Sequence, residues 1–209
     1  MDKPLNKQSP PGRLPARERL LAAAEELFYQ DGVQSVGIDR VVERAGVAKA
    51  SLYSNFKGKD DLVRAYLTAR QEARRAAIET RLALHKAPRA RMLAVFDAMT
   101  EPLAKPNYRG CAFLRATAEM PADASGREVC RDARRWTRDL LSRLAKEAGA
   151  ANPDTLAKQL MLLYDGAAAS AQMDRDPAAA VEAKAAAVLL IDKACVKRRQ
   201  SRATARSMK

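Results

Sequence analysis

Apolar residues recur every three to four positions along most of the chain, and nowhere do they alternate with polar residues as in a β-strand. The apolar stripes lie in segments bounded by Pro and Gly, which favour the start and the end of a helix respectively. The pattern therefore predicts an all-α fold with about nine helices. These helices are expected over residues 15–31, 38–45, 49–56, 59–84, 88–102, 111–120, 126–148, 153–173 and 177–195.

Residues 39–62, DRVVERAGVAKASLYSNFKGKDDL, contain two short predicted helices separated by a tight break at Gly46. Glycine readily adopts the left-handed conformation that a helix C-terminus often needs. Leu52 and Phe56 lie four residues apart, so they face inward together on the second helix. The other face of this helix has no acid and consists of Lys49, Ala50, Ser51, Tyr53, Ser54 and Asn55. Such a face is typical of a helix that reads the DNA major groove, because it must approach closely and donate to phosphates and base edges.

The segment GVQSVGIDRVVERAGVAKASLYSNFKGKDDL resembles the DNA-binding signature of the TetR (tetracycline-repressor-like) family of bacterial regulators. The matching positions, at the family's spacing, are Phe28, Gly32, Ile38, Val41, Ala45, Gly46, Val47, Leu52, Tyr53, Phe56, Lys59 and Leu62. The family usually has Ser or Thr in place of Gly37, Ser in place of Ala48, and His or Tyr in place of Asn55. RGCAFL, at residues 109–114, resembles a stretch that recurs in one branch of the family.

The resemblance implies a ligand-responsive, DNA-binding transcriptional regulator, most often a repressor that acts on double-stranded operator DNA. The DNA contacts are expected from Gly37, Ala48, Lys49, Ala50, Ser51, Tyr53, Ser54, Asn55 and Lys59. Lys59 is also expected at the start of the fourth helix, where the helix dipole favours a phosphate.

Four regions are expected along the chain: a flexible arm (1–14), a helix-turn-helix DNA-binding domain (15–60), a ligand-binding and dimerisation bundle (61–195) and a basic disordered tail (196–209). The resemblance implies a homodimer formed through residues of about 154–195, with the last two helices paired with their copies. A face of small residues there favours close packing, and it consists of Gly166, Ala168, Ala169 and Ala171. Two recognition helices would then occupy successive major grooves of a near-palindromic operator.

The small-molecule effector is expected to bind among apolar residues of the bundle, since ligand sites between helices have mainly apolar walls. The candidate pocket residues are Phe96, Met99, Phe113, Thr117, Met120, Trp136, Leu140 and Tyr164. Glu119 and Asp165 are further candidates for polar contacts. The alternative is that these residues form plain core or surface, because Met and aromatic stripes at helical spacing usually pack in a core.

The net charge of +13 is concentrated away from the helix-turn-helix motif. Residues 193–209 carry seven basic residues and no acid, whereas residues 1–60 carry ten basic and eight acidic residues. The total charge therefore does not by itself indicate that the motif binds DNA. The basic tail favours either solubility or nonspecific attraction to nucleic acid, which leaves a nonspecific nucleoid or RNA-binding protein as an alternative.

Other classes of protein find little support in the sequence. No apolar run reaches transmembrane length and no signal-peptide pattern is present, so a cytoplasmic protein without membrane contact is expected. His85 is the only histidine and there is no glycine-rich phosphate loop, so no catalytic residues, metal or cofactor are expected. Cys111, Cys130 and Cys195 fit neither a disulfide framework nor a zinc site, and a redox sensor at Cys111 or Cys130 is an alternative regulator.

Overall fold

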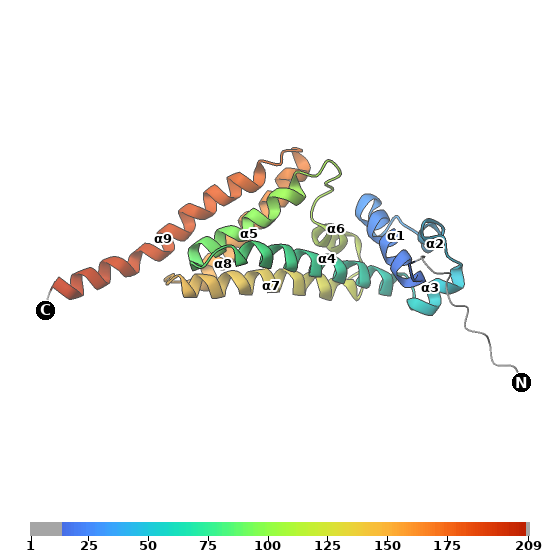
Figure 1. The fold of residues 1–209 in the computed structure, drawn as a ribbon, viewed down its shortest axis with the longest axis horizontal. Helices are drawn as coiled ribbons and strands as arrows, with labels where there is room; N and C mark the ends of the chain where they lie inside the picture. The colour runs from blue at the N-terminus through green and yellow to red at the C-terminus, as the bar shows by residue number, and fades with distance from the viewer. Residues whose placement is uncertain (1–13, 208–209) are drawn as a thin grey trace, which may run out of the picture.

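The computed structural model describes the backbone of residues 14–207 and the side chains of residues 14–195, and all regular structure in this part is helical. The all-α prediction is therefore confirmed. The helices are α1 (Ala16–Asp31), α2 (Ile38–Ala45), α3 (Lys49–Asn55), α4 (Lys59–Ala83), α5 (Pro88–Leu103), α6 (Ala112–Glu119), α7 (Gly126–Glu147), α8 (Pro153–Met173) and α9 (Ala179–Ser207). Figure 1 shows α1, α2 and α3 grouped at one end of an elongated molecule, with α4 and α7 running side by side into the other helices.

Two glycines end the first two helices as predicted. Gly32 follows α1 with φ of 92°, and Gly46 follows α2 in the left-handed region with φ of 60° and ψ of 44°. The N–H of Gly46 donates to the carbonyl of Glu43 over 3.0 Å, which closes the last turn of α2. Because a Cβ is strained at these positive φ angles, glycine allows the chain to turn after α1 at Gly32 and into α3 at Gly46.

The helices at the N-terminal end share one hydrophobic cluster, which extends past the predicted domain boundary at residue 60. Phe28 of α1 packs edge-on against Tyr66 of α4, with ring centroids 5.7 Å apart. From the later part of the chain the same cluster includes Ala116, Met120 and Cys130. The start of α4, α6 and the start of α7 thus pack with the helix-turn-helix unit, and the predicted boundary itself stays a prediction.

The remaining helices enclose a second, larger cluster. It draws on the end of α4 and on α5, α7, α8 and α9, with α9 packed against both α8 and α5. Phe96 of α5 and Tyr164 of α8 meet edge-on at its centre, with ring centroids 6.2 Å apart. The molecule therefore has two cores joined by the long helices α4 and α7.

Two helix ends differ from prediction. Phe56 is not the last residue of α3 but its extended C-cap, with φ of −139°. The helical backbone of α9 continues to Ser207, past the predicted end near Cys195. The side chains from residue 196 onward, and the arm predicted over residues 1–14 except Leu14, lie outside the described residues. Within the described part of the chain, no helix is both long and apolar enough to cross a membrane.

Candidate DNA-binding interface

Helix α3 is attached to the protein along one side only. Leu52 is fully buried and Phe56 is 3% exposed, as their spacing predicted. Tyr53 on the opposite side is 54% exposed. The other members of the predicted groove face are exposed or half-buried, namely Lys49, Ala50, Ser51, Ser54 and Asn55. This face lies at the end of the molecule (Figure 1), so α3 is free to enter a groove as wide as the DNA major groove.

Arg19 of α1 holds the break between α2 and α3. Its Nη1 donates to the carbonyls of Ala45 at 3.1 Å and Gly46 at 2.9 Å. The last carbonyls of a helix have no partner within the helix, and a positive charge beside them is favourable. Periodicity did not single out Arg19, because its contact joins residues far apart in the sequence. The Arg19 side chain therefore fixes the turn that connects α2 to α3.

The polar residues at the end of α3 bond back to their own helix. Ser54 Oγ donates to the Ser51 carbonyl over 3.0 Å, and Asn55 Nδ2 donates to the same oxygen over 2.7 Å. Asn55 Nδ2 also donates to Ser54 Oγ over 3.3 Å, and the amide oxygen of Asn55 stays available as an acceptor. The side chains are thus held close to the helix, which keeps the face narrow.

Lys49 at the start of α3 forms an exposed ion pair with Asp39 of α2, with Nζ and Oδ1 2.7 Å apart. The hydrogen bond and the charge of Asp39 raise the pKa of Lys49. Exposed ion pairs contribute little to stability, so a DNA phosphate can replace Asp39 at small cost. Lys49 therefore fits its predicted role at the edge of a groove.

Lys59 at the start of α4 points toward the loop between α1 and α2. Its Nζ donates to the carbonyl of Gln34 over 3.0 Å, and the N–H of Gln34 donates to Glu119 over 3.1 Å. Burial lowers the pKa of Lys59, while the nearby Glu119 acts in the opposite sense. Its position at the DNA-facing end agrees with a phosphate contact, but in this structure the ammonium also anchors the loop. Lys57, two residues earlier, is exposed and was not among the predicted contacts.

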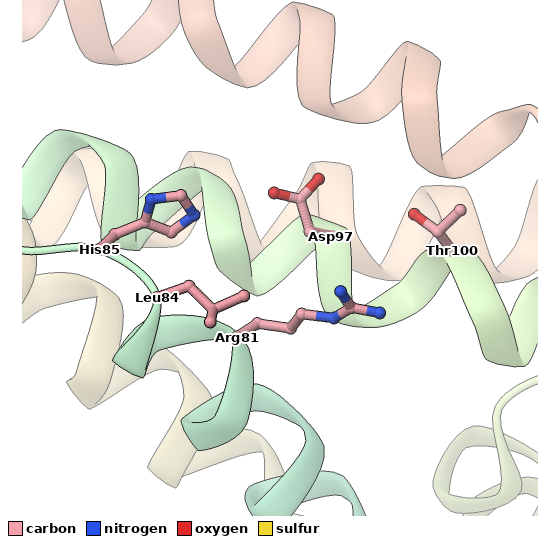
Figure 2. Close-up of a pocket in the computed structure, with 5 residues that line it drawn as sticks. All are labelled: Arg81, Leu84, His85, Asp97 and Thr100. Carbon is pink, nitrogen blue, oxygen red and sulfur yellow. The ribbon is translucent and has the colours of Figure 1, made fainter.

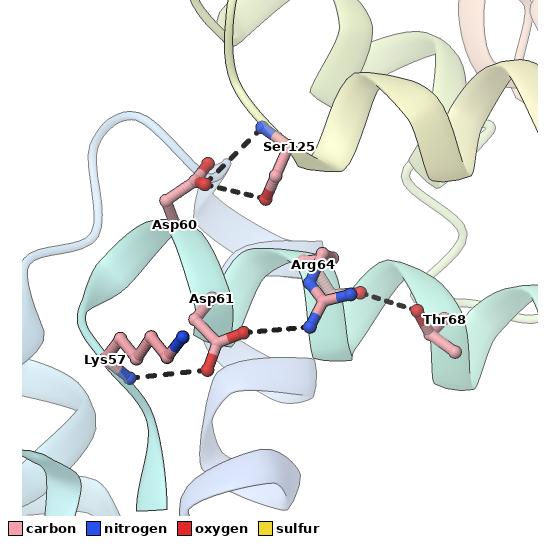
Figure 3. Close-up of polar contacts among 6 residues, drawn as sticks. All are labelled: Lys57, Asp60, Asp61, Arg64, Thr68 and Ser125. Atoms are coloured by element: carbon pink, nitrogen blue, oxygen red, sulfur yellow. Dashed lines mark hydrogen bonds and ion pairs between the residues drawn. The ribbon is translucent and has the colours of Figure 1, made fainter.

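The acids in the first turn of α4 fix the position of this helix (Figure 3). Asp60 accepts hydrogen bonds from Ser125 Oγ at 2.7 Å and from the Ser125 N–H at 3.4 Å, which ties α4 to the segment before α7. Asp61 accepts from the Lys57 N–H at 3.3 Å and from Arg64 Nη2 at 3.2 Å. Burial raises the pKa of Asp61, but these hydrogen bonds and charges outweigh it and lower the pKa overall. The start of α4 is thus linked both to α3 and to the second half of the chain.

Comparison with known proteins decides the family. Residues 20–66 match the family model "Bacterial regulatory proteins, tetR family". The structure is similar to that of SCO4454, a TetR-family transcriptional regulator from Streptomyces coelicolor, with a TM-score of 0.81 and 33% identity over 86% of this chain and 90% of that one. The chain belongs to the TetR family. It is a DNA-binding transcriptional regulator and not an enzyme, as predicted.

Sequence similarity to two HTH-type transcriptional regulators covers less of the chain. SrpR and TtgW, both HTH-type transcriptional regulators from Pseudomonas putida, are each 30% identical to it over 89 residues, or 43% of this chain. The match spans 42% of SrpR and 66% of TtgW. The sequence likeness to these regulators thus covers less than half of this TetR-family chain.

The effector-pocket candidates of this TetR-family chain fall on two cores. Phe96, Met99, Leu140 and Tyr164 are buried in the larger cluster, with Trp136 half-buried against it. Met120 is buried in the N-terminal cluster, with Phe113 packed against that one. Thr117 forms a hydrogen bond with Cys130. The eight residues therefore do not line one common cavity, and their role stays a prediction.

A cleft of about 290 Å³ lies elsewhere, between the end of α4 and α5 (Figure 2). It is lined by Arg81, Leu84, His85, Asp97 and Thr100, none of which was a pocket candidate. Asp97 is already paired with Lys184 of α9, with Nζ and Oδ1 2.6 Å apart. The lining is mostly exposed and polar, unlike the apolar walls expected of an effector site.

Proposed function

We propose that this TetR-family chain acts in the cytoplasm as a homodimeric repressor, binds a near-palindromic operator and releases it when a small molecule binds the helical bundle. The observation that carries the proposal is the exposed face of α3, small and free of acids, at one end of the molecule. The DNA contacts would come from the residues predicted above, with Tyr53 as the most prominent side chain. A near-palindrome follows from two copies of α3 related by two-fold symmetry.

An apolar face on α8 and α9 supports the homodimer. On α8, Leu162 and Met173 are 69% and 81% exposed, and the intervening Gly166 has open space where a Cβ would stand. On α9, Val181 and Leu189 are 57% and 73% exposed. The spacing of Leu162, Gly166 and Met173 puts them on one side of α8, and exposed apolar positions of this kind are typical of a surface that another protein covers. We call this surface the α8–α9 face and assign it to the second subunit.

The small-residue pattern predicted for α8 divides between two surfaces. Ala168 and Ala171 are buried in the intrachain core, whereas Gly166 is exposed and Ala169 is half-buried. Only the latter two are placed to meet a partner. The residues available for dimerisation are therefore the large exposed side chains together with Gly166 and Ala169.

Binding of a dimer to a near-palindromic operator is tested by selecting bound fragments of the source genome with the purified protein. Nuclease footprints on the selected fragments are expected to show two half-sites one helical turn of DNA, about 34–36 Å, apart or a multiple of that spacing. Sedimentation is expected to give a dimer at micromolar concentration. A footprint without two-fold symmetry, or a monomer that binds as tightly, would contradict the proposal.

The redox-sensor alternative, which named Cys111 or Cys130, has less support in the geometry at Cys130. Cys130 is buried, and this burial raises the pKa of its thiol despite the hydrogen bond with Thr117. A thiol is reactive mainly as the thiolate, so a raised pKa makes Cys130 a poor sensor. A non-covalently bound effector in the helical bundle agrees better with the buried thiol of Cys130.

A further inference from the structure

Arg74 of α4 lies where four helices of the bundle meet. Its Nη2 donates to the carbonyl of Ala133 on α7 over 2.6 Å, and its guanidinium carbon is 4.5 Å from the centre of the Phe113 ring on α6. On α8, burial raises the pKa of Tyr164, and the charge of Arg74 and a hydrogen bond with its guanidinium act against that rise. Periodicity alone did not identify Arg74, because an apolar stripe carries no information about contacts between segments far apart in the chain.

The positive charge of Arg74 has only neutral partners in the described part of the chain. Two other arginines of these helices are paired, Arg70 with Glu25 at 3.3 Å and Arg134 with Asp165. Arg74 forms no such ion pair there, and its Nε is buried without a hydrogen-bond acceptor. A buried donor without an acceptor costs free energy, and an unpaired charge costs more. The Arg74 guanidinium can therefore still bind a negatively charged group.

We propose that Arg74 binds the acidic group of the effector, which is an organic anion with an aromatic or apolar body. A carboxylate or sulfonate can accept from Nε and a terminal nitrogen of one guanidinium at the same time. The body of the ligand would replace neighbouring side chains against the ring of Phe113, which the guanidinium already contacts. The inference rests on the proposed function, since it names the chemical class of that effector.

The position of Arg74 also gives the anion a route to the DNA-binding end. Phe113 stacks on the guanidinium and belongs to α6, whose Ala116 is part of the N-terminal cluster. An anion on Arg74 competes with the ring for the positive charge, because cation–π attraction depends on that charge being unscreened. Arg75 also has a buried Nε without an acceptor, but the ring contact of its guanidinium is with Trp136 on α7, not with α6. Arg74 is therefore the better anchor.

Two dyes of almost equal shape test the charge preference. 8-Anilinonaphthalene-1-sulfonate is an organic anion, and N-phenyl-1-naphthylamine is the same skeleton without the sulfonate. Each is titrated into the full-length protein without DNA, and its fluorescence is followed. The wild type is expected to bind the sulfonate saturably, one per chain, and about tenfold or more tighter than the neutral dye, as a charge-assisted bond predicts.

Arg74→Met removes the charge but keeps an apolar stem, and it is expected to abolish the preference while neutral-dye binding stays as in the wild type. Arg74→Lys should restore part of the preference. The matched control is Arg81→Met, which removes an exposed arginine of the same helix that lines the other cleft. The circular dichroism signal and neutral-dye affinity show that each variant is folded.

Several results would overturn the assignment: no saturable binding of the sulfonate by the wild type, an unchanged preference in Arg74→Met, or an equal loss in Arg81→Met. Operator binding is measured separately on unliganded protein. Failure to bind operator would contradict the proposed function as a regulator and would leave the result of the dye titration unchanged. Anion binding that does not release a bound operator would contradict the assignment of Arg74 to the effector site.

Discussion

The exposed face of α3 and the α8–α9 face differ in polarity and in charge, and these two properties decide which kind of partner can bind each face. The α3 face is small and polar, and it carries Lys49 and the exposed phenol of Tyr53 but no acid. The α8–α9 face is apolar, with Leu162, Met173 and Leu189 each more than two-thirds exposed. The α3 face suits the phosphate backbone of DNA, because the affinity of a protein for DNA comes mainly from charge. A second protein surface favours the other, because apolar burial drives association.

The two faces also depend on different features of the rest of the chain. The α3 face needs rigid placement, which Arg19 gives from α1 through its bonds to the break before α3. The α8–α9 face needs only that its apolar residues stay outward. Substitutions that add bulk or charge to one face should therefore leave the other working.

The largest effect is expected from Ala50→Trp on the α3 face. The indole would hold the helix away from the groove floor, so operator binding should be lost in gel-shift or anisotropy titrations. The helical circular dichroism signal and the dimer should remain. Ala76→Trp, at an exposed position on α4, is the control and should bind normally. Retained binding by Ala50→Trp would place the DNA on another surface.

The second largest effect is expected from Gly166→Arg on the α8–α9 face. Dimerisation would bury an unpaired guanidinium, which costs several kcal/mol, roughly 3–5. Sedimentation should show a monomer, and operator affinity should fall by about a hundredfold or more, as a loss of roughly 3 kcal/mol predicts. Ala77→Arg, exposed on α4, should remain dimeric. A dimeric Gly166→Arg protein would move the interface elsewhere.

Much of the difference between the two faces could be predicted from the sequence. The features that could not be predicted were missed for physical reasons. The number of helices and the inward positions of Leu52 and Phe56 follow from local periodicity, and the break between α2 and α3 follows from Gly46. All of these depend on residues that are close together in the sequence. The contacts of Arg19, Lys59 and Arg74 join segments far apart in the chain, and periodicity carries no information about such pairs. The pocket candidates were chosen for apolar character alone, so the pattern did not show that Phe113 and Phe96 belong to different cores.

A smaller effect is expected from Arg19→Met, which sharpens the requirement for rigid placement. Loss of the two hydrogen bonds to the end of α2 should lower the free energy of unfolding by about 1–2 kcal/mol, measured by urea titration with an unchanged m-value. Operator affinity should fall as well, since α3 loses its fixed start. Arg131→Met, an exposed arginine on α7, should change neither quantity. Equal stability of both variants would show that Arg19 does not hold the break.

Lys59→Ala should have a weaker effect and tests whether this lysine serves the DNA or only the loop. If its ammonium binds a phosphate, affinity falls about equally on all sequences and the salt slope of log K flattens by roughly one unit. If it only anchors Gln34, stability falls and the slope is unchanged. Lys86→Ala, exposed between α4 and α5, is the control. An unaltered slope would remove Lys59 from the predicted contacts.

The smallest effect is expected from Trp136→Phe, which acts inside the bundle and should leave both open faces intact. Trp136 is half-buried against the larger core, and the guanidinium carbon of Arg75 lies 5.1 Å from the centre of its ring. As the only tryptophan, it reports on that site through its emission. If the effector binds beside it, emission should change saturably with the ligand that releases operator. The Phe variant should keep its fold, its dimer and its DNA affinity, while the apparent ligand affinity changes a few-fold. If a ligand that releases DNA binds both proteins equally and leaves the emission untouched, then Trp136 is a core residue and the effector lies elsewhere in the bundle.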